Sequence, residues 1–178
     1  MNERDELVSV ALGEAPAGLV IRGGSLVNVY TGEVYRADVA IKGDRIAAVG
    51  DVERCIGEGT QVVDAAGRYL VPGFIETHFH VGATSLGSTE LARLLVPFGT
   101  AAIVTDFTEA TKLAGVQAAR FFLDEANRTP LKVYMSPFFT VLLPSATRRS
   151  VTIEELDDML GWPETLELRE WNGRSSRH

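Results

Sequence analysis

Two histidines, His78 and His80, are the residues of this chain whose types and spacing best suit chemistry. They stand one residue apart at the end of an apolar run with β character, which begins at Tyr69 and passes through Pro72-Gly73. Alternate side chains of a strand point to the same face, so both imidazoles should lie on one face. Two imidazoles at this spacing can bind one divalent metal ion, and we interpret the pair as metal ligands. The alternative is a pair of surface or hydrogen-bonded histidines.

Carboxylates at the ends of later apolar runs could complete such a site. Asp106 ends the run 100–105, Glu109 lies in the loop after it, and Glu170 ends the run 165–170. Histidines and carboxylates at one mouth are typical of a hydrolytic metal centre, in which the metal lowers the pKa of a bound water. A helix N-cap is the alternative role for Asp106, and a surface carboxylate at a strand end is the alternative for Glu170.

The hydrophobic period after residue 80 changes from two to about four, which predicts helices between strands. Helices are predicted at 89–96 with Ser88 as cap, from after Asp106 to about 127, and after a capping box at 152–155. Strands are predicted at 100–105, 131–135 and 165–170. Alternating strands and helices predict a parallel sheet with right-handed crossovers. With the run that ends in the histidines, this amounts to the first half of a (β/α)8 TIM-type barrel, whose functional side chains lie at the carboxyl ends of the strands.

The residues before this region show a different pattern. Short β-type runs separated by glycine turns predict a small antiparallel β domain at 18–68. Residues 1–17 are charged and then small, which indicates a mobile N-terminal arm with room for one short helix. The expected organisation of this α/β chain is therefore an arm at 1–17, a β domain at 18–68 and a partial barrel at 69–178.

Composition excludes several classes of function. The net charge of −7, from 24 acidic and 17 basic residues, disfavours nucleic acid and anionic membrane as partners. The single cysteine, Cys55, cannot form an internal disulfide, and the cytoplasm is the expected compartment. The N-terminus has no long apolar segment, so no signal peptide is expected, and no uncharged run is long enough for a membrane span.

The run VPGFIETHFH at residues 71–80 directly follows the predicted β domain. Together with the stretches 26–51, 62–80, 90–106, 123–137 and 156–170, it resembles the amidohydrolase superfamily and, within it, adenine deaminases. In that superfamily such a run opens the barrel with metal-binding histidines, and a small β domain precedes it. The resemblance covers nearly the whole chain after residue 18, and only the front portion of a full family member.

The resemblance implies roles for individual residues. His78 and His80 match the paired histidine ligands of the first strand. Glu170 matches the fourth-strand carboxylate that bridges two metal ions, and it is the implied catalytic residue. Asp106 and Glu109 match the ends of an aspartate-proline-histidine-glutamate motif. The implied metal ligands are therefore His78, His80, Asp106, Glu109 and Glu170.

The sequence departs from the family at several positions. Phe107-Thr108 occupy the middle of the motif, so its histidine is missing. Gly82 lies in a segment where the family usually has isoleucine, glutamate and serines, and Glu76 stands where aspartate is common. The later histidines and the last-strand aspartate of the superfamily lie beyond residue 178.

The resemblance implies a hydrolase that uses one or two divalent ions (Mn, Fe or Zn) to convert adenine and water to hypoxanthine and ammonia. The alternatives are an amidohydrolase acting on another cyclic or linear amide and a non-catalytic remnant. The expected partner is a small-molecule substrate, a purine base or an amide, and a homo-oligomer is left open. We expect this chain to be inactive alone.

Overall fold

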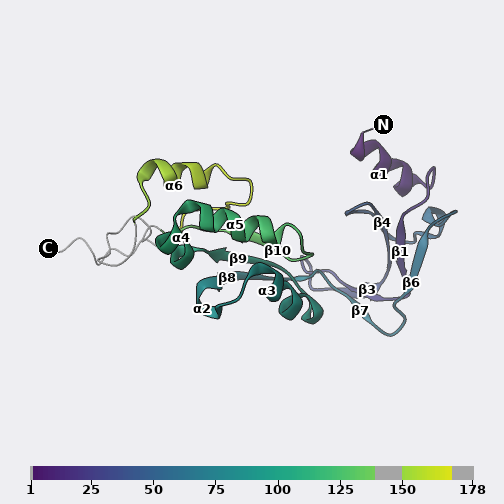
Figure 1. Cartoon of the computed structure of the whole chain (residues 1–178). Helices are drawn as coiled ribbons and strands as arrows, with labels where there is room; N and C mark the ends of the chain where they lie inside the picture. Colours follow the sequence, from purple (N-terminus) through teal and green to yellow (C-terminus); the bar gives the residue numbers. More distant parts are fainter. Residues whose placement is uncertain (1, 139–149, 170–178) are drawn as a thin grey trace. The chain divides into compact units, whose positions relative to one another are not determined.

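The computed structural model describes residues 2–138 and 150–169, which form two compact units, Met1–Pro72 and Gly73–His178 (Figure 1). Each unit has its own hydrophobic core. Across the described residues, no helix is long and apolar enough to cross a membrane.

The first unit consists of two small sheets and one helix. Strands β1 (Leu19–Arg22), β4 (Asp38–Lys42), β5 (Arg45–Gly50) and β6 (Gln61–Asp64) form one sheet in the order β5-β4-β1-β6. The other sheet has the order β3-β2-β7 and is formed by β2 (Ser25–Val27), β3 (Val34–Arg36) and β7 (Tyr69–Leu70). A short 3-10 helix, η1 (Glu53–Cys55), precedes β6.

The expectation of a purely antiparallel β domain is wrong, because both sheets are mixed. β1 pairs with β4 antiparallel but with β6 parallel, and β2 pairs with β3 antiparallel but with β7 parallel. β6 and β7 lie far along the chain from their parallel partners β1 and β2, and parallel pairing requires such a long separation. The pattern of apolar runs and glycine turns carries no information about that direction.

The described part of the expected N-terminal arm is packed. Residues Glu3–Leu12 form helix α1, whose capping box joins Asn2 and Asp5 and whose last turn is closed by Gly13. Val10 is fully buried in the core of the first unit. The helix has no broad apolar stripe, which explains why hydrophobic periodicity gave no signal for its packing.

Cys55 lies in this same core. Its side chain is fully buried, and its thiol donates to the carbonyl oxygen of Val10 at 3.1 Å. The neighbouring Arg54 donates from Nε to the carbonyl oxygen of Ala11 at 2.9 Å. These contacts hold the C-terminal end of α1 against η1.

The boundary between the units falls at Pro72 and Gly73. The run that begins at Tyr69 is therefore divided, since Tyr69–Leu70 is β7 of the first unit and Phe74–His80 is β8 of the second. A Cβ atom at Gly73 would lie 2.4 Å from the Cβ atom of Ala101. Glycine is thus required here by the close approach of the two backbones.

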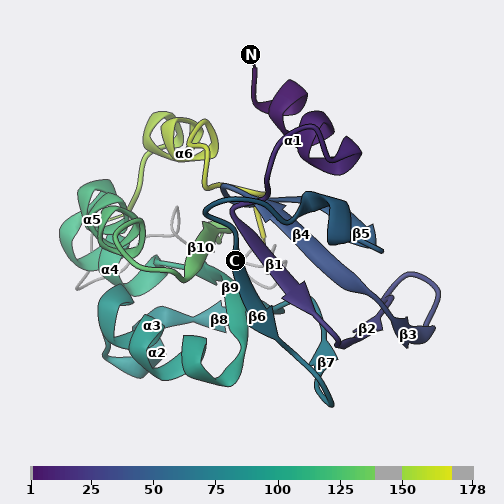
Figure 2. The same cartoon turned by 90° about the vertical axis from the view of Figure 1, so that its right-hand side faces the viewer.

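The second unit is built on a parallel sheet of order β10-β9-β8, with β9 at Thr100–Asp106 and β10 at Lys132–Met135. After β10, residues 165–169 continue the sheet through two isolated parallel bridges, Met135 with Thr165 and Phe138 with Arg169. Helices α2 (Val81–Thr84), α3 (Ser88–Leu95), α4 (Thr108–Ala114), α5 (Val116–Ala126) and α6 (Ile153–Leu160) connect the strands, with the 3-10 helix η2 (Val96–Phe98) before β9 (Figure 2).

The predicted strands at β9 and β10 and the capping box of α6 are confirmed. In that box Thr152 N–H donates to Glu155 at 3.0 Å and Glu155 N–H donates to the Thr152 hydroxyl at 3.1 Å. The predicted fourth strand is confirmed only as the two bridges, and its last residue, Glu170, lies outside the described residues.

Two details of the predicted helices are wrong. The single helix expected after Asp106 is broken into α4 and α5 by Gly115, which adopts a φ of 82°. Ser88 does not cap α3; its hydroxyl donates to the carbonyl oxygen of Phe122 at 2.8 Å.

The Glu125 carboxylate of α5 accepts the N–H groups of Ser88 and Thr89 at 3.0 and 3.2 Å. Burial opposes the charged form, yet the hydrogen bonds from Thr89 and Ser88 hold the pKa of Glu125 below its ordinary value.

Candidate metal centre

The two histidines lie on one face at the carboxyl end of β8. Their ring centroids are 4.9 Å apart, with an angle of 57° between the ring planes. The ring of Phe138 packs edge-on against both, at 6.4 Å from His78 and 5.5 Å from His80. The strand periodicity therefore placed the two imidazoles together as expected.

Asp106 contacts His80 directly. The end of β9 pairs with the end of β8 so that the two residues are opposite each other, and Oδ2 of Asp106 lies 2.7 Å from Nδ1 of His80. The other oxygen, Oδ1, accepts the N–H of Thr108 at 2.9 Å, and the side chain is only 2% exposed. The carboxylate therefore both accepts a hydrogen bond at the start of α4, whose N-cap is Phe107, and contacts the imidazole.

This contact gives the two ring nitrogens of His80 different roles, one as hydrogen-bond donor and one as acceptor or metal ligand. An ionised carboxylate can only accept, so the proton of a neutral His80 lies on Nδ1 and Nε2 carries the lone pair. A carboxylate behind a metal-binding imidazole typically fixes the orientation of the ring and raises its basicity. The geometry suits Asp106 as the partner that orients His80, and its predicted role as a ligand stays a prediction.

Glu109 lies on α4 against α2. A Cβ atom at Gly82 would lie 2.5 Å from Oε2 of Glu109 and 3.0 Å from its Cβ atom. A larger residue at position 82 would have to displace the glutamate, so Gly82 and Glu109 fit each other. In the same segment Phe107 is buried and stacks on Phe122, with ring centroids 5.5 Å apart. Phe107 therefore contributes to the packing of the start of α4 against α5.

Glu170, the remaining candidate ligand, lies outside the described residues, so its place in the site stays a prediction. Over residues 2–138 and 150–169, no group of three or more His, Cys, Asp or Glu side chains is arranged to hold a metal ion. Two imidazoles with an orienting carboxylate fit a divalent cation chemically, but a protein site usually needs about three ligands. The described residues thus bring together two candidate ligands, and the metal-ligand role stays a prediction.

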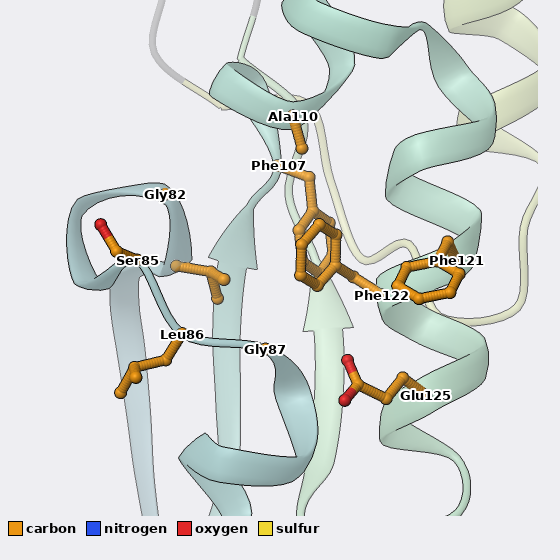
Figure 3. A pocket seen from close by; sticks show the side chains of 10 residues that line it. Gly82, Ser85, Leu86, Gly87, Phe107, Ala110, Phe121, Phe122 and Glu125 are labelled. Atoms are coloured by element: carbon orange, nitrogen blue, oxygen red, sulfur yellow. The ribbon is translucent and has the colours of Figure 1, made fainter.

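A cavity of about 470 Å³ lies between α2, the start of α3, α4 and α5, and neither histidine lines it (Figure 3). Its walls are largely apolar, and Figure 3 shows the stacked Phe107 and Phe122 with Phe121 beside them. The carboxylate of Glu125 points toward Gly87, at the start of α3. Sequence reasoning missed this cavity, although Val81 and Phe107 directly follow the two strand ends and could have indicated it.

Sequence analysis assigned no contact with the histidines to three further residues. Phe138 packs against both imidazoles, Glu76 accepts a hydrogen bond from the backbone of His78 at 2.9 Å, and Arg169 reaches the carbonyl oxygen of Thr77. Phe138 follows a predicted strand, which is a usable signal. The contact of Arg169 joins positions 92 residues apart and has no sequence signature.

Comparison with known proteins places these features in context. No family model matches the chain. An adenine deaminase of Moorella thermoacetica is 40% identical over 168 residues, which cover 94% of this chain and 27% of that protein. Adenine deaminase 4 of Rhizobium meliloti is 46% identical over 131 residues, covering 74% of this chain and 22% of that protein. The chain resembles an N-terminal portion of adenine deaminases.

Two solved structures resemble this chain in fold. A D-aminoacylase, described as defining a subset of amidohydrolases, matches with a TM-score of 0.53 at 22% identity, over 81% of this chain and 35% of that one. The atrazine chlorohydrolase TrzN of Arthrobacter aurescens, solved with zinc, matches with a TM-score of 0.56 at 14% identity, over 84% of this chain and 46% of that one. The chain thus has a mixed α/β fold related to the TIM barrel.

Proposed function

We propose that this chain is the metal-binding front portion of an adenine deaminase-type hydrolase. The observation that carries the proposal is the carboxyl end of β8, where His78 and His80 share a face and Asp106 contacts Nδ1 of His80. The 40% identity to an adenine deaminase, over 94% of the chain and 27% of that protein, supports the proposed reaction class.

The fold proposed for this portion is a first half-barrel. Strands β8, β9 and β10 are parallel. The segment 165–169 makes parallel bridges to Met135 of β10 and to Phe138, which follows β10. The chain spans about 27% of the length of the Moorella relative, and the remaining strands would come from a part that this chain does not cover. Closure of the barrel would pair the free side of β8.

In the proposed reaction, adenine and water give hypoxanthine and ammonia. His78 and His80 would hold the cation through imidazole nitrogens, and Glu170 would be the third ligand. A bound divalent ion, Mn, Fe or Zn, supplies Lewis acidity that lowers the pKa of a coordinated water. Asp106 holds the proton on Nδ1 of His80 and keeps the ring directed at the site. A cytoplasmic location is part of the proposal, since a single buried thiol needs no oxidising compartment.

The chain alone is proposed to be inactive. Its described residues bring together two imidazoles and one orienting carboxylate, and among these described residues no further carboxylate or histidine completes a metal-ligand group. Turnover would require the part of the relatives that this chain does not cover.

A second candidate function is hydrolysis of another cyclic or linear amide. The fold-level likeness to D-aminoacylase favours it, because the same sheet and histidine pair can serve a different substrate pocket.

Two measurements test the proposal. Equilibrium dialysis with zinc, followed by elemental analysis, should show binding by the chain that falls at least about tenfold in His80→Ala. As a matched control, the exposed Arg93→Met on α3 should bind zinc like the wild type. Equal zinc contents in the wild type and His80→Ala would refute the metal site.

A chimera separates the two substrates. The chain would replace the matching portion of the Moorella thermoacetica adenine deaminase, and the product would be assayed for ammonia release from adenine and for hydrolysis of N-acyl-D-amino acids. Release from adenine supports the first function, and hydrolysis of the acylated amino acids supports the second. A folded, zinc-loaded chimera that is inactive on both would indicate a non-catalytic remnant.

A further inference from the structure

A bulge interrupts β8 immediately before His78. Glu76 pairs with Ile103 of β9, and the next pair is Phe79 with Thr105. Thr77 and His78 therefore stand opposite the single residue Val104. Such bulges redirect side chains and often lie next to functional sites, because the extra residue is released from the ladder.

The peptide bond between Thr77 and His78 is held by two side chains instead. The carboxylate of Glu76 accepts the N–H of His78 at 2.9 Å. Nη1 of Arg169 donates to the carbonyl oxygen of Thr77 at 2.5 Å. Both polar groups of one planar peptide unit are thus engaged, and rotation of that plane would turn the attached His78.

Other contacts hold the Arg169 side chain and backbone in place. Its Nε and Nη2 atoms donate to Oε1 of Glu167 at 3.0 and 2.6 Å. Its backbone N–H donates to the carbonyl oxygen of Pro137 at 2.9 Å, and it bridges to Phe138, whose ring contacts both imidazoles. The planar guanidinium serves both partners through separate N–H groups, which a lysine cannot do with the same geometry.

We propose that Glu76 and Arg169 are positioning residues that clamp the Thr77–His78 peptide and so hold the His78 imidazole on the face it shares with His80. The consequence for metal affinity rests on the proposed function. Ligands held in place by such supporting bonds bind metal more tightly, because less orientation is lost on binding. The clamp joins residues 165–169, the fourth segment of the sheet, to β8. The position of residues 165–169 and the position of the histidine pair therefore depend on each other.

The test uses the full 178-residue chain and two readouts. Arg169→Met and Glu76→Leu each remove one arm of the clamp, and Arg169→Lys and Glu76→Gln each keep a hydrogen-bonding group. Arg93→Met, a change at an exposed arginine on α3, is the matched control. Hydrogen–deuterium exchange resolved to the amide of His78 is measured without metal, with the amide of the fully buried Ile103 as an internal check of folding. Zinc affinity is measured by competition with a chelator.

In the metal-free chain, Arg169→Met and Glu76→Leu should accelerate exchange at His78 about tenfold, with exchange at Ile103 unchanged. Zinc affinity should fall about tenfold, with partial recovery in Arg169→Lys and Glu76→Gln. Wild-type exchange at His78 in both Arg169→Met and Glu76→Leu would overturn the clamp, even if zinc binds. Accelerated exchange in a chain that binds no zinc would leave the clamp standing and refute the proposed function.

Discussion

Arg120 of α5 and Glu164, which follows α6, form a two-pronged ion pair. Nη2 of Arg120 lies 2.8 Å from Oε1 of Glu164, and Nη1 lies 3.1 Å from Oε2. Asn127 adds a hydrogen bond of 3.2 Å to Oε1, and the guanidinium carbon lies 5.0 Å from the ring centre of Trp162. The backbone carbonyl of Glu164 accepts the N–H of Met135, so the pair sets where residues 165–169 meet β10.

Loss of this pair should destabilise the second unit. Arg120→Met leaves a carboxylate that is only 16% exposed without its main partner, and we expect a loss of about 2 kcal/mol in the free energy of unfolding. Asp124 also contacts Arg120, at 2.9 Å, but it is 58% exposed, so the control Asp124→Asn should cost about 0.5 kcal/mol or less. Urea unfolding measures both. Equal losses for the two variants would contradict the central role of Glu164.

The same pair predicts a loss of stability in acid. Hydrogen bonding from Arg120 outweighs burial and lowers the pKa of Glu164 from 4.5 to about 2. The folded state therefore takes up the proton less readily than the unfolded state, so this contribution is complete above pH 4.5 and is lost as the pH falls toward 2. In urea unfolding, the stability difference between the wild type and Glu164→Gln should shrink steadily across that interval. A difference independent of pH would refute the assignment.

The contact between Asp106 and His80 predicts a separation of metal affinity from stability. Asp106→Asn keeps an oxygen for the N–H of Thr108 but no longer holds a proton on Nδ1 of His80 as a carboxylate does. Zinc affinity should fall about tenfold to a hundredfold, with little change in the midpoint of thermal unfolding. Asp106→Ala, which also removes the acceptor for Thr108, should lower the midpoint as well. Wild-type zinc affinity in Asp106→Asn would exclude the orienting role.

The close approach at Gly73 predicts a steric coupling that a second substitution relieves. Gly73→Ala would place two Cβ atoms 2.4 Å apart, and we expect a cost of about 1–3 kcal/mol from the forced backbone shift. Gly73→Ala combined with Ala101→Gly removes the clash and should recover most of that loss. A double-mutant cycle by urea unfolding measures the coupling. Additive losses would show that the contact with Ala101 is not the cause.

Local signals in the sequence predicted much of the second unit. The alternation of His78 and His80 indicated their shared face, the apolar run ending at Asp106 indicated β9, and Thr152 with Glu155 indicated the start of α6. Each of these depends on neighbouring residues only, through strand or helix geometry.

Features that depend on distant partners were not predictable in this way. Ser88 is a residue type that often caps helices, but here the carboxylate of Glu125 on α5 accepts the N–H of Ser88 at the start of α3. The parallel pairing of β6 with β1 and the contact of Arg169 with Thr77 likewise join segments far apart in the chain. Tertiary contacts decide such choices after the local elements have formed, so local periodicity carries no trace of them.

The burial of Cys55 gives this molecule a chemical reporter of its own opening. The chain has one cysteine, and its fully buried thiol is engaged with Val10. An alkylating reagent such as iodoacetamide can reach that sulfur only when α1 separates from the core of the first unit. The rate of labelling therefore follows fluctuations of the unit Met1–Pro72.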